Sequence, residues 1–191
     1  SKRMSTDTEN GHTEEAYWYV MRDLKRRNAK NPAYSMLEDA GFEVFTPMKW
    51  EVCTSRGRKV RERVPYVQDL LFVHSDRGRL DKVVSRTGTL QYRFVRGGSY
   101  CQPMVVANRE MERFIAAVGT TDSPVYYLPG ELTPSMVGRA VRIIGGPLDG
   151  YEGNLLSVRG SRTKRLIVEL PEFFSAGVEV DPEYIELVRQ P

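Results

Sequence analysis

A glycine-rich stretch, Val141–Val158 (VRIIGGPLDGYEGNLLSV), has the composition of a loop that could hold a phosphate group. In loops of the form GxxxxGK(S/T), backbone N–H groups surround the phosphate, and the lysine and hydroxyl after the last glycine complete the site. Here Gly153 is followed by Asn154 and Leu155, which supply neither group. The stretch lies between two apolar runs, which favours a turn between strands of a small β-barrel.

The other reactive side chains offer little for catalysis. His74 is followed by Ser75 and Asp76, but a Ser-His-Asp triad is a spatial arrangement that chain neighbours do not form. Cys53 and Cys101 are far apart in the sequence and provide too few soft ligands for a metal, and a reducing cytoplasm suits them. We therefore predict a cytoplasmic protein that is not an enzyme and has no catalytic residue, metal or cofactor.

Positive charge is concentrated in two places, although the net charge is only +3. The first cluster is Lys25, Arg26, Arg27 and Lys30. The second is the stretch 49–63 (KWEVCTSRGRKVRER), where six Lys and Arg residues accompany only two carboxylates. Each cluster alone could be a solvated loop, but two of them in one small domain favour a surface that faces a polyanion.

The chain has 191 residues, of which 40% are hydrophobic and 28% charged, and this composition fits one large or two small globular domains. No apolar run is long enough to span a membrane. We expect a disordered polar leader over 1–15, an α+β domain over 16–119, a proline-containing linker over 120–134 and an all-β domain over 135–190. Within the linker, Val-Tyr-Tyr-Leu is apolar enough for part of it to dock against a neighbour.

Hydrophobic periodicity predicts the elements that position these residues. Helices are expected over 31–41, 77–88 and 107–119, with Asn31 and Asn108 as N-caps. Strands are expected over 16–21, 69–73 and 89–95 and in a long hairpin whose tip carries the basic stretch. This order predicts an antiparallel sheet with helices on one face. After the linker, five short strands with glycine-rich turns predict a small barrel.

The two halves resemble known modules. The strand, Gly146-Pro147 turn and strand-opening Gly153 resemble a KOW module, whose fold is an SH3-like barrel. Trp18-Tyr19-Val20, the run 42–47 and Leu70–Val73 resemble the NGN domain, an antiparallel sheet flanked by helices with a ferredoxin-like α+β fold. Because the two modules occur in this order, the chain is identified as a member of the NusG family.

The resemblance implies a transcription elongation factor that binds RNA polymerase and promotes processive elongation or antitermination. An apolar depression on the NGN sheet would hold the clamp helices, and binding would favour the closed clamp. The implied polymerase-binding residues are Leu70, Phe72, Phe94, Met21, Arg79 and Lys82. The implied nucleic-acid-binding residues, facing the non-template DNA strand or nascent RNA, are Lys25, Arg26, Arg27, Lys30 and Arg86.

Some features resemble specialised paralogues. The stretch from Tyr17 to Trp50 resembles the capsular-polysaccharide-locus antiterminators of Bacteroides-type bacteria, and Gln68-Asp69 replaces the family's Pro-Gly/Asn pair. The KOW domain would take a ribosomal protein or a termination factor as partner. The alternative is a KOW-containing RNA-binding protein that acts on the ribosome. Its candidate RNA-binding residues are Arg159, Arg162, Lys164 and Arg165.

Overall fold

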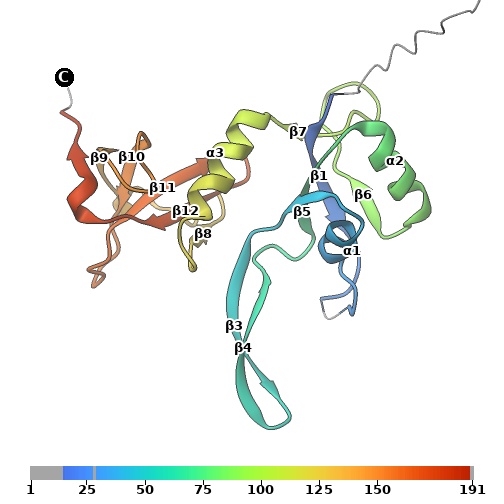
Figure 1. Cartoon of the computed structure of the whole chain (residues 1–191), viewed down its shortest axis with the longest axis horizontal. Coiled ribbons are helices and arrows are strands. Elements are labelled where there is room, and N and C mark those ends of the chain that lie inside the picture. Colours follow the sequence, from blue (N-terminus) through green and yellow to red (C-terminus); the bar gives the residue numbers. More distant parts are fainter. Residues whose placement is uncertain (1–14, 28, 190–191) are drawn as a thin grey trace, which may run out of the picture.

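The computed structural model describes residues 15–27 and 29–189, so the predicted leader lies almost entirely outside the described residues. Two domains follow one another along the chain, and helix α3 lies between them (Figure 1). The helices are α1 (Ala33–Asp39), α2 (Arg77–Arg86) and α3 (Asn108–Val118), with short 3-10 helices η1 (Pro134–Met136) and η2 (Pro182–Tyr184). Two domains of α+β and all-β class were predicted, and the structure confirms this fold class.

The N-terminal domain is built on a five-stranded antiparallel sheet in the order β2-β5-β1-β6, with β7 also paired to β1. Its strands are β1 (Tyr17–Asp23), β2 (Glu43–Phe45), β5 (Leu70–Ser75), β6 (Leu90–Tyr92) and β7 (Val105–Val106). The central pair, β1 and β5, is buried almost throughout. Such continuous burial requires cover on both faces of the sheet, because successive side chains point to opposite faces.

The two faces of this sheet have different covers. On one face, Tyr19, Met21, Leu71 and Val73 pack with α1 and α2. On the other, Trp18, Val20, Leu70 and Phe72 pack with α3 and with residues of the C-terminal domain. The prediction that all helices lie on one face was therefore wrong. The apolar stripe of α3 showed that the helix would be buried, but helical periodicity does not specify which face of a sheet covers it.

The predicted asparagine caps of two helices were also wrong. The N-cap position of α1 is Pro32 rather than Asn31, and no side-chain hydrogen bond is made there. Instead the buried carboxylate of Asp23 accepts hydrogen bonds from the Lys25 and Ala33 N–H groups at 2.9 and 2.8 Å. Asn108 is the first residue of α3 and donates its side-chain N–H to the Ala16 carbonyl. Both helix starts are thus tied to the ends of β1.

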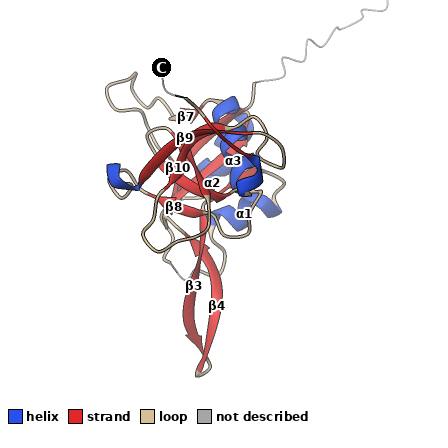
Figure 2. Cartoon of the chain, turned by 90° about the vertical axis from the view of Figure 1, so that its left-hand side faces the viewer, coloured by secondary structure: helices blue, strands red, loops and turns tan. Residues whose placement is uncertain are grey.

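Strands β3 (Met48–Ser55) and β4 (Arg58–Pro65) form a hairpin that pairs with no other strand. It projects far from the body of the molecule, as Figures 1 and 2 show from two directions. Arg56 and Gly57 form its tip, both with positive φ (50° and 76°). The hairpin and its basic tip were predicted from the sequence, and the structure confirms them.

The C-terminal domain is one six-stranded antiparallel sheet in the order β13-β9-β10-β11-β12-β8. Its strands are β8 (Val125–Tyr127), β9 (Val137–Ile143), β10 (Glu152–Leu156), β11 (Arg165–Leu170), β12 (Phe174–Glu179) and β13 (Ile185–Leu187). The edge strand β8 comes from the segment predicted as linker and pairs with β12. Its apolar Val-Tyr-Tyr run is therefore docked.

The glycine-rich stretch connects β9 to β10. Gly146 has φ +69°, and a Cβ there would meet the Tyr184 ring at 2.8 Å. Gly153 stands at the close approach of two strands, where a Cβ would lie 3.0 Å from the Ile167 carbonyl oxygen. Gly146 adopts a left-handed backbone conformation that favours glycine. At Gly153, glycine is required because there is too little space for a side chain. The stretch is a turn between strands.

Candidate functional site

Three aromatic rings of the N-terminal domain, here together called the trough, lie between its sheet and α3 and are buried in part by the C-terminal domain. Phe72 on β5 and Phe114 on α3 form the walls of the trough, and Phe45 on β2 lies 6.2 and 6.0 Å from their ring centroids. Alternation places Phe72 on the face opposite Leu71, and the apolar stripe of α3 turns Phe114 toward the sheet. Three aromatic rings from three separate elements thus line one trough.

The C-terminal domain fills this trough with two adjacent phenylalanines. Phe173, in the turn before β12, lies 5.3 Å from Phe72 in an edge-to-face arrangement. Phe174, the first residue of β12, lies 5.4 Å from Phe114 and 6.2 Å from Phe72. Phe72 has no exposed surface as a result. Edge-to-face aromatic pairs add stabilisation beyond the area they bury, so this contact is a specific one.

Two tyrosines close the trough beside the phenylalanines. Tyr126 of β8 packs on Phe114, Phe174 and Tyr66. Burial raises the pKa of Tyr126 to about 12, an effect that Arg63 partly offsets. Tyr66 donates a hydrogen bond to Glu131 at 2.9 Å, and burial together with this bond raises its pKa to about 12. Both hydroxyls are therefore neutral over the physiological pH range.

A second contact joins the domains on the outer side of α3. The Tyr151 hydroxyl donates to the Arg113 carbonyl at 2.7 Å, and the Arg113 guanidinium lies 4.7 Å from the centre of the Tyr151 ring. Tyr151 belongs to the glycine-rich stretch, so this turn helps to position the C-terminal domain on α3. The aromatic trough contact and this polar contact hold α3 from two sides.

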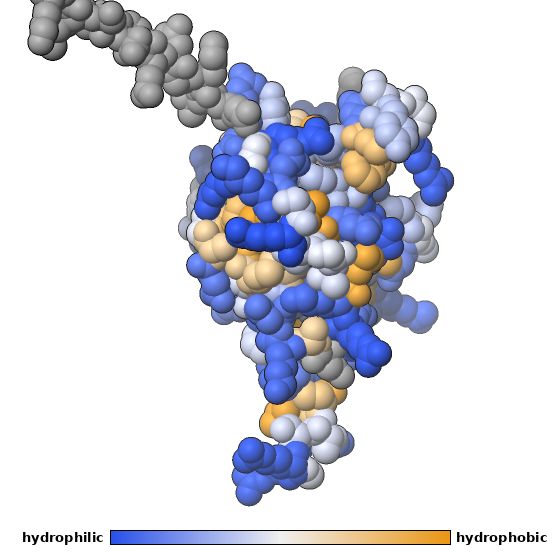
Figure 3. Space-filling view, turned by 90° about the vertical axis from the view of Figure 1, so that its right-hand side faces the viewer, coloured by the Kyte–Doolittle hydropathy of each residue, from blue (hydrophilic) through white to orange (hydrophobic). Residues whose placement is uncertain are grey.

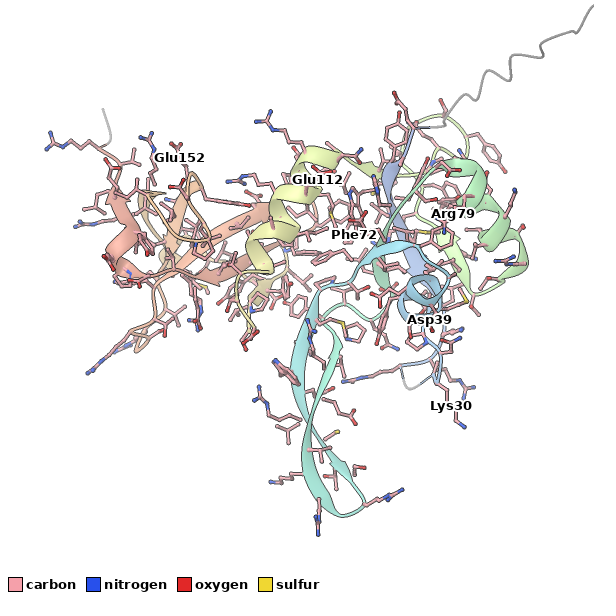
Figure 4. The ribbon with its side chains drawn as sticks, in the orientation of Figure 1. Lys30, Asp39, Phe72, Arg79, Glu112 and Glu152 are labelled. Carbon is pink, nitrogen blue, oxygen red and sulfur yellow. The ribbon has the colours of Figure 1, made fainter. Side chains whose placement is uncertain are left out.

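The residues predicted to bind polymerase do not all lie on the same face of the sheet. Leu70 and Phe72 share the trough face of β5. Met21 is fully buried on the opposite face of the sheet, under α1 and α2. Phe94 is 47% exposed beside Tyr92, on the side that Met21 faces. In Figure 4, Phe72 lies toward the C-terminal domain, whereas Arg79 lies on the far side of the N-terminal domain.

Helix α2 holds the two remaining predicted polymerase residues. The Arg79 guanidinium lies 4.0 Å from the Phe42 ring centre and donates to the Ala40 carbonyl, so it ties α2 to the end of α1. Lys82 is exposed one turn further on. Arg79 therefore has a structural contact that accounts for its position, and only Lys82 is fully available to a partner.

The predicted nucleic-acid-binding residues gather at one end of the sheet. Four of them lie in the loop between β1 and α1, and the Leu24 N–H donates to the Thr89 carbonyl, which brings the chain just after Arg86 to this loop. Arg27 Nη2 donates to both carboxylate oxygens of Glu51 on β3, at 2.6 and 2.5 Å. This hydrogen bonding raises the pKa of Arg27 and lowers that of Glu51. Arg26, Lys30 and Arg86 are exposed.

The structure adds four site residues that sequence reasoning missed: Phe45, Phe114, Phe173 and Phe174. Phe114 was recognised as part of an apolar helix stripe, but only its meeting with Phe72 makes it a trough wall. Phe173-Phe174 is a pair of adjacent aromatic residues at the start of a strand, of which β12 buries only the second fully. The pair is visible in the sequence, but Phe173 lies in the turn before β12, so strand alternation does not place its ring, and only the tertiary structure shows that both rings meet Phe72.

Other chemistry is not indicated. Within residues 15–27 and 29–189, no group of His, Cys, Asp and Glu could hold a metal ion. His74 stacks on Trp18 and lies 3.2 Å from Glu43. In the same part of the chain, no helix has the length and apolar character that a bilayer crossing requires.

Fold and site together describe a two-domain protein in which residues of both domains meet at the aromatic trough. Residues 16–115 match the protein family described as "Transcription termination factor nusG". The chain therefore belongs to the NusG family of transcription factors. A solved structure described as "Domain interaction in Thermotoga maritima NusG" aligns with 18% sequence identity and a TM-score of 0.47, covering 92% of this chain and 98% of that chain. No curated protein matches the sequence.

Proposed function

We propose that this protein binds RNA polymerase through the Phe45–Phe72–Phe114 trough and promotes processive elongation and antitermination. The observation that carries the proposal is the trough itself. It is a set of aromatic side chains on the domain that the family model matches, and a separate domain contributes to its cover. An aromatic-lined depression is a suitable receptor for an apolar partner surface, and the clamp helices of polymerase are the partner that family resemblance suggests.

The same geometry makes polymerase and the C-terminal domain competitors. Phe173 and Phe174 occupy the space between Phe72 and Phe114, so a second ligand can enter only when they leave. The apparent affinity for polymerase is then reduced by the fraction of molecules that are closed. Any partner that captures the free C-terminal domain, such as a ribosomal protein or a termination factor, would favour the polymerase-bound state.

The basic loop between β1 and α1 would contact the non-template DNA strand. Arg26 and Lys30 are exposed cations, and Tyr34 on α1 is a partly exposed aromatic residue nearby. Single strands are bound by charge combined with base stacking. Because Arg27 is paired with Glu51, we expect Arg26→Gln to weaken single-stranded DNA binding more than Arg27→Gln does.

A specialised role at polysaccharide-type operons remains part of the proposal. It is supported by the long basic hairpin and by Gln68-Asp69 at the mouth of β5, where Asp69 lies within 4 Å of Arg22 and Arg93. These ion pairs give the edge of the trough a polar chemistry that a Pro-Gly pair would lack. Comparison of readthrough on such operons with readthrough on unrelated ones tests this point.

The direct test is affinity purification of the tagged full-length protein from its native cell, followed by transcription assays. We expect the purification to yield RNA polymerase, and the purified protein to increase readthrough of a terminator by purified polymerase. Recovery of ribosomes without polymerase would reject the proposal and support the ribosomal alternative, whose residues Arg159, Arg162 and Lys164 are exposed between β10 and β11.

A further inference from the structure

The β3–β4 hairpin has two chemically different faces. Residues directly opposite one another on paired strands share a face, and the register pairs Trp50 with Arg63 and Val52 with Arg61. One face, here called the cationic face, therefore carries Trp50, Val52, Thr54, Lys59, Arg61 and Arg63. The other face carries both carboxylates of the hairpin, Glu51 and Glu62, opposite each other. A sequence that looks mixed in charge is sorted by the strand alternation into a purely basic face and a mixed one.

The cations of this face are available to a ligand. Lys59, Arg61 and Arg63 are all exposed, and none of them forms an ion pair with any carboxylate that the structure describes. Among the described residues, the only ion pair of the hairpin joins Arg27 to Glu51 and uses the opposite face. It fastens the basic loop to that face and leaves the cationic face open.

An exposed aromatic residue accompanies these charges. Trp50 is 45% exposed, and the Arg61 guanidinium lies 4.8 Å from the centre of its ring. Val52, on the same face, is 64% exposed. In Figure 3 the hairpin ends in a hydrophilic tip, with apolar surface exposed between this tip and the body of the molecule. Apolar side chains that a monomer leaves uncovered beside unpaired arginines indicate a surface that binds a partner.

We propose that the cationic face of the hairpin binds duplex DNA. The hairpin is an isolated two-stranded ribbon of eight paired residues on each strand, and the major groove of B-DNA is wide enough to admit such a ribbon. Lys59, Arg61 and Arg63 contact phosphates, and the apolar surface of Trp50 and Val52 lies against the groove wall. Double-stranded RNA is excluded because its major groove is too narrow for side chains to enter.

The cationic face lies opposite the face to which the basic loop is paired, and only its base, at Trp50 and Arg63, comes close to Tyr126 of the trough. Duplex binding by the hairpin does not require polymerase, so it can be measured on the full-length protein alone, and its failure would leave the proposed polymerase contact untouched. In an elongation complex it would hold the duplex that flanks the transcription bubble. Substitutions in the hairpin should then weaken duplex binding, whereas substitutions of Arg26 and Lys30 should weaken single-strand binding.

The test is fluorescence anisotropy with a labelled DNA duplex, a single strand and an RNA duplex, each over a salt series. The triple substitution Lys59→Gln, Arg61→Gln, Arg63→Gln is compared with Arg96→Gln, Arg109→Gln, Arg139→Gln, which removes the same charge from exposed positions outside the hairpin. We expect the hairpin variant to lose at least about tenfold in duplex affinity at low salt. The slope of log K against log salt should fall by up to about 2.7, at about 0.9 for each lost phosphate contact.

The control variant should keep duplex affinity within about twofold, and Trp50→Ala should weaken duplex binding while leaving the charge unchanged. Circular dichroism of each variant shows whether the sheet is retained. Equal affinity of the hairpin variant and the wild-type protein for the DNA duplex would overturn the proposal. Equal loss in the two triple variants would also overturn it, because binding would then reflect net charge alone, and so would preference for the RNA duplex.

Discussion

The two faces of the N-terminal sheet are equally apolar but are covered in different ways. Leu71 and Val73 are buried by α1 and α2, which belong to the same domain. Phe72 is buried by Phe173 and Phe174, about a hundred residues further along the chain and in another domain. The first face can be uncovered only by unfolding. The second is covered by α3 and by the C-terminal domain, and the proposed competition requires that the two domains separate.

This difference shows that burial alone does not identify a structural core. Leu71 and Phe72 are neighbours on β5, with exposures of 2% and 0%, yet only Phe72 lies on a surface that a partner could use. Domain contacts within a chain commonly resemble transient interfaces, and the proposal requires that this one, although hydrophobic, can open. Under the proposal, cover by a second domain is the feature that distinguishes the trough from a hydrophobic core.

The strongest test of this comparison uses the neighbouring residues Leu71 and Phe72. Leu71→Ala should lower the free energy of unfolding by about 2–5 kcal/mol, because it leaves a cavity under α1 and α2, and the domains should stay in contact. Phe72→Ala should cost about 3–5 kcal/mol and also separate the domains. Chemical denaturation measures the first effect and small-angle X-ray scattering the second. Equal radii of gyration for the two variants would contradict the distinction.

A smaller effect is expected from Asp23, which fixes the start of α1 on the face of the sheet that α1 and α2 cover. Asp23→Ala removes the acceptor of the Lys25 and Ala33 N–H groups, and leaving a buried donor unsatisfied costs about 1–3 kcal/mol. Denaturation should show a less stable N-terminal domain with an unchanged domain contact. The matched control is Asp149→Ala, which removes a carboxylate that accepts from an exposed backbone N–H group, that of Gly145. If the control is as destabilising as Asp23→Ala, burial of the Asp23 bonds is not the cause.

The smallest expected effect is a pH dependence of the contact between the two domains. Burial raises the pKa of Tyr126 to about 12 from its ordinary 10.0, so its contribution to stability is fully present below pH 10 and is lost as the pH rises toward 12. The domain contact should weaken in this window. Tyr126→Phe should reduce the pH dependence, while Tyr66, whose pKa is also raised to about 12, continues to titrate. An identical pH profile in the variant would show that Tyr126 does not ionise at this contact.

Much of the fold followed from local patterns. The apolar run of β5, the stripes of the helices, the basic hairpin and the glycine turns each depend on neighbours in the sequence, and the structure has them. The start of α1 was mistaken because the carboxylate of Asp23 replaced the expected cap, and the cap of α3 because Asn108 lies inside the helix and donates to the Ala16 carbonyl. The position of α3 was mistaken because periodicity shows that a helix buries one side but not what lies against it.

The candidate site was harder to predict for the same reason. Leu70 and Phe72 could be placed on one strand face by counting residues, whereas Met21 was placed with them although it faces the other way. Phe114, Phe173 and Phe174 reach the trough through contacts between segments that are far apart in the sequence. Such contacts depend on tertiary geometry, which neither spacing nor composition records.

The central claim is that the C-terminal domain and polymerase compete for the trough, and Phe173→Ala tests it most directly. Phe173 is only partly buried and contacts Phe72 across the domain boundary, so its removal should weaken closure and leave both domains folded. Tyr184→Ala is the control, because that ring packs over Gly145 and Gly146 of its own domain.

The measurement is the dissociation constant of the full-length protein for core RNA polymerase, by biolayer interferometry with wild-type and both variants. We expect Phe173→Ala to bind about tenfold more tightly than wild-type, which corresponds to about 1.4 kcal/mol of lost closure, and Tyr184→Ala to bind like wild-type. Weaker binding of Phe173→Ala than of wild-type, or equal binding by all three proteins, would contradict competition for the trough.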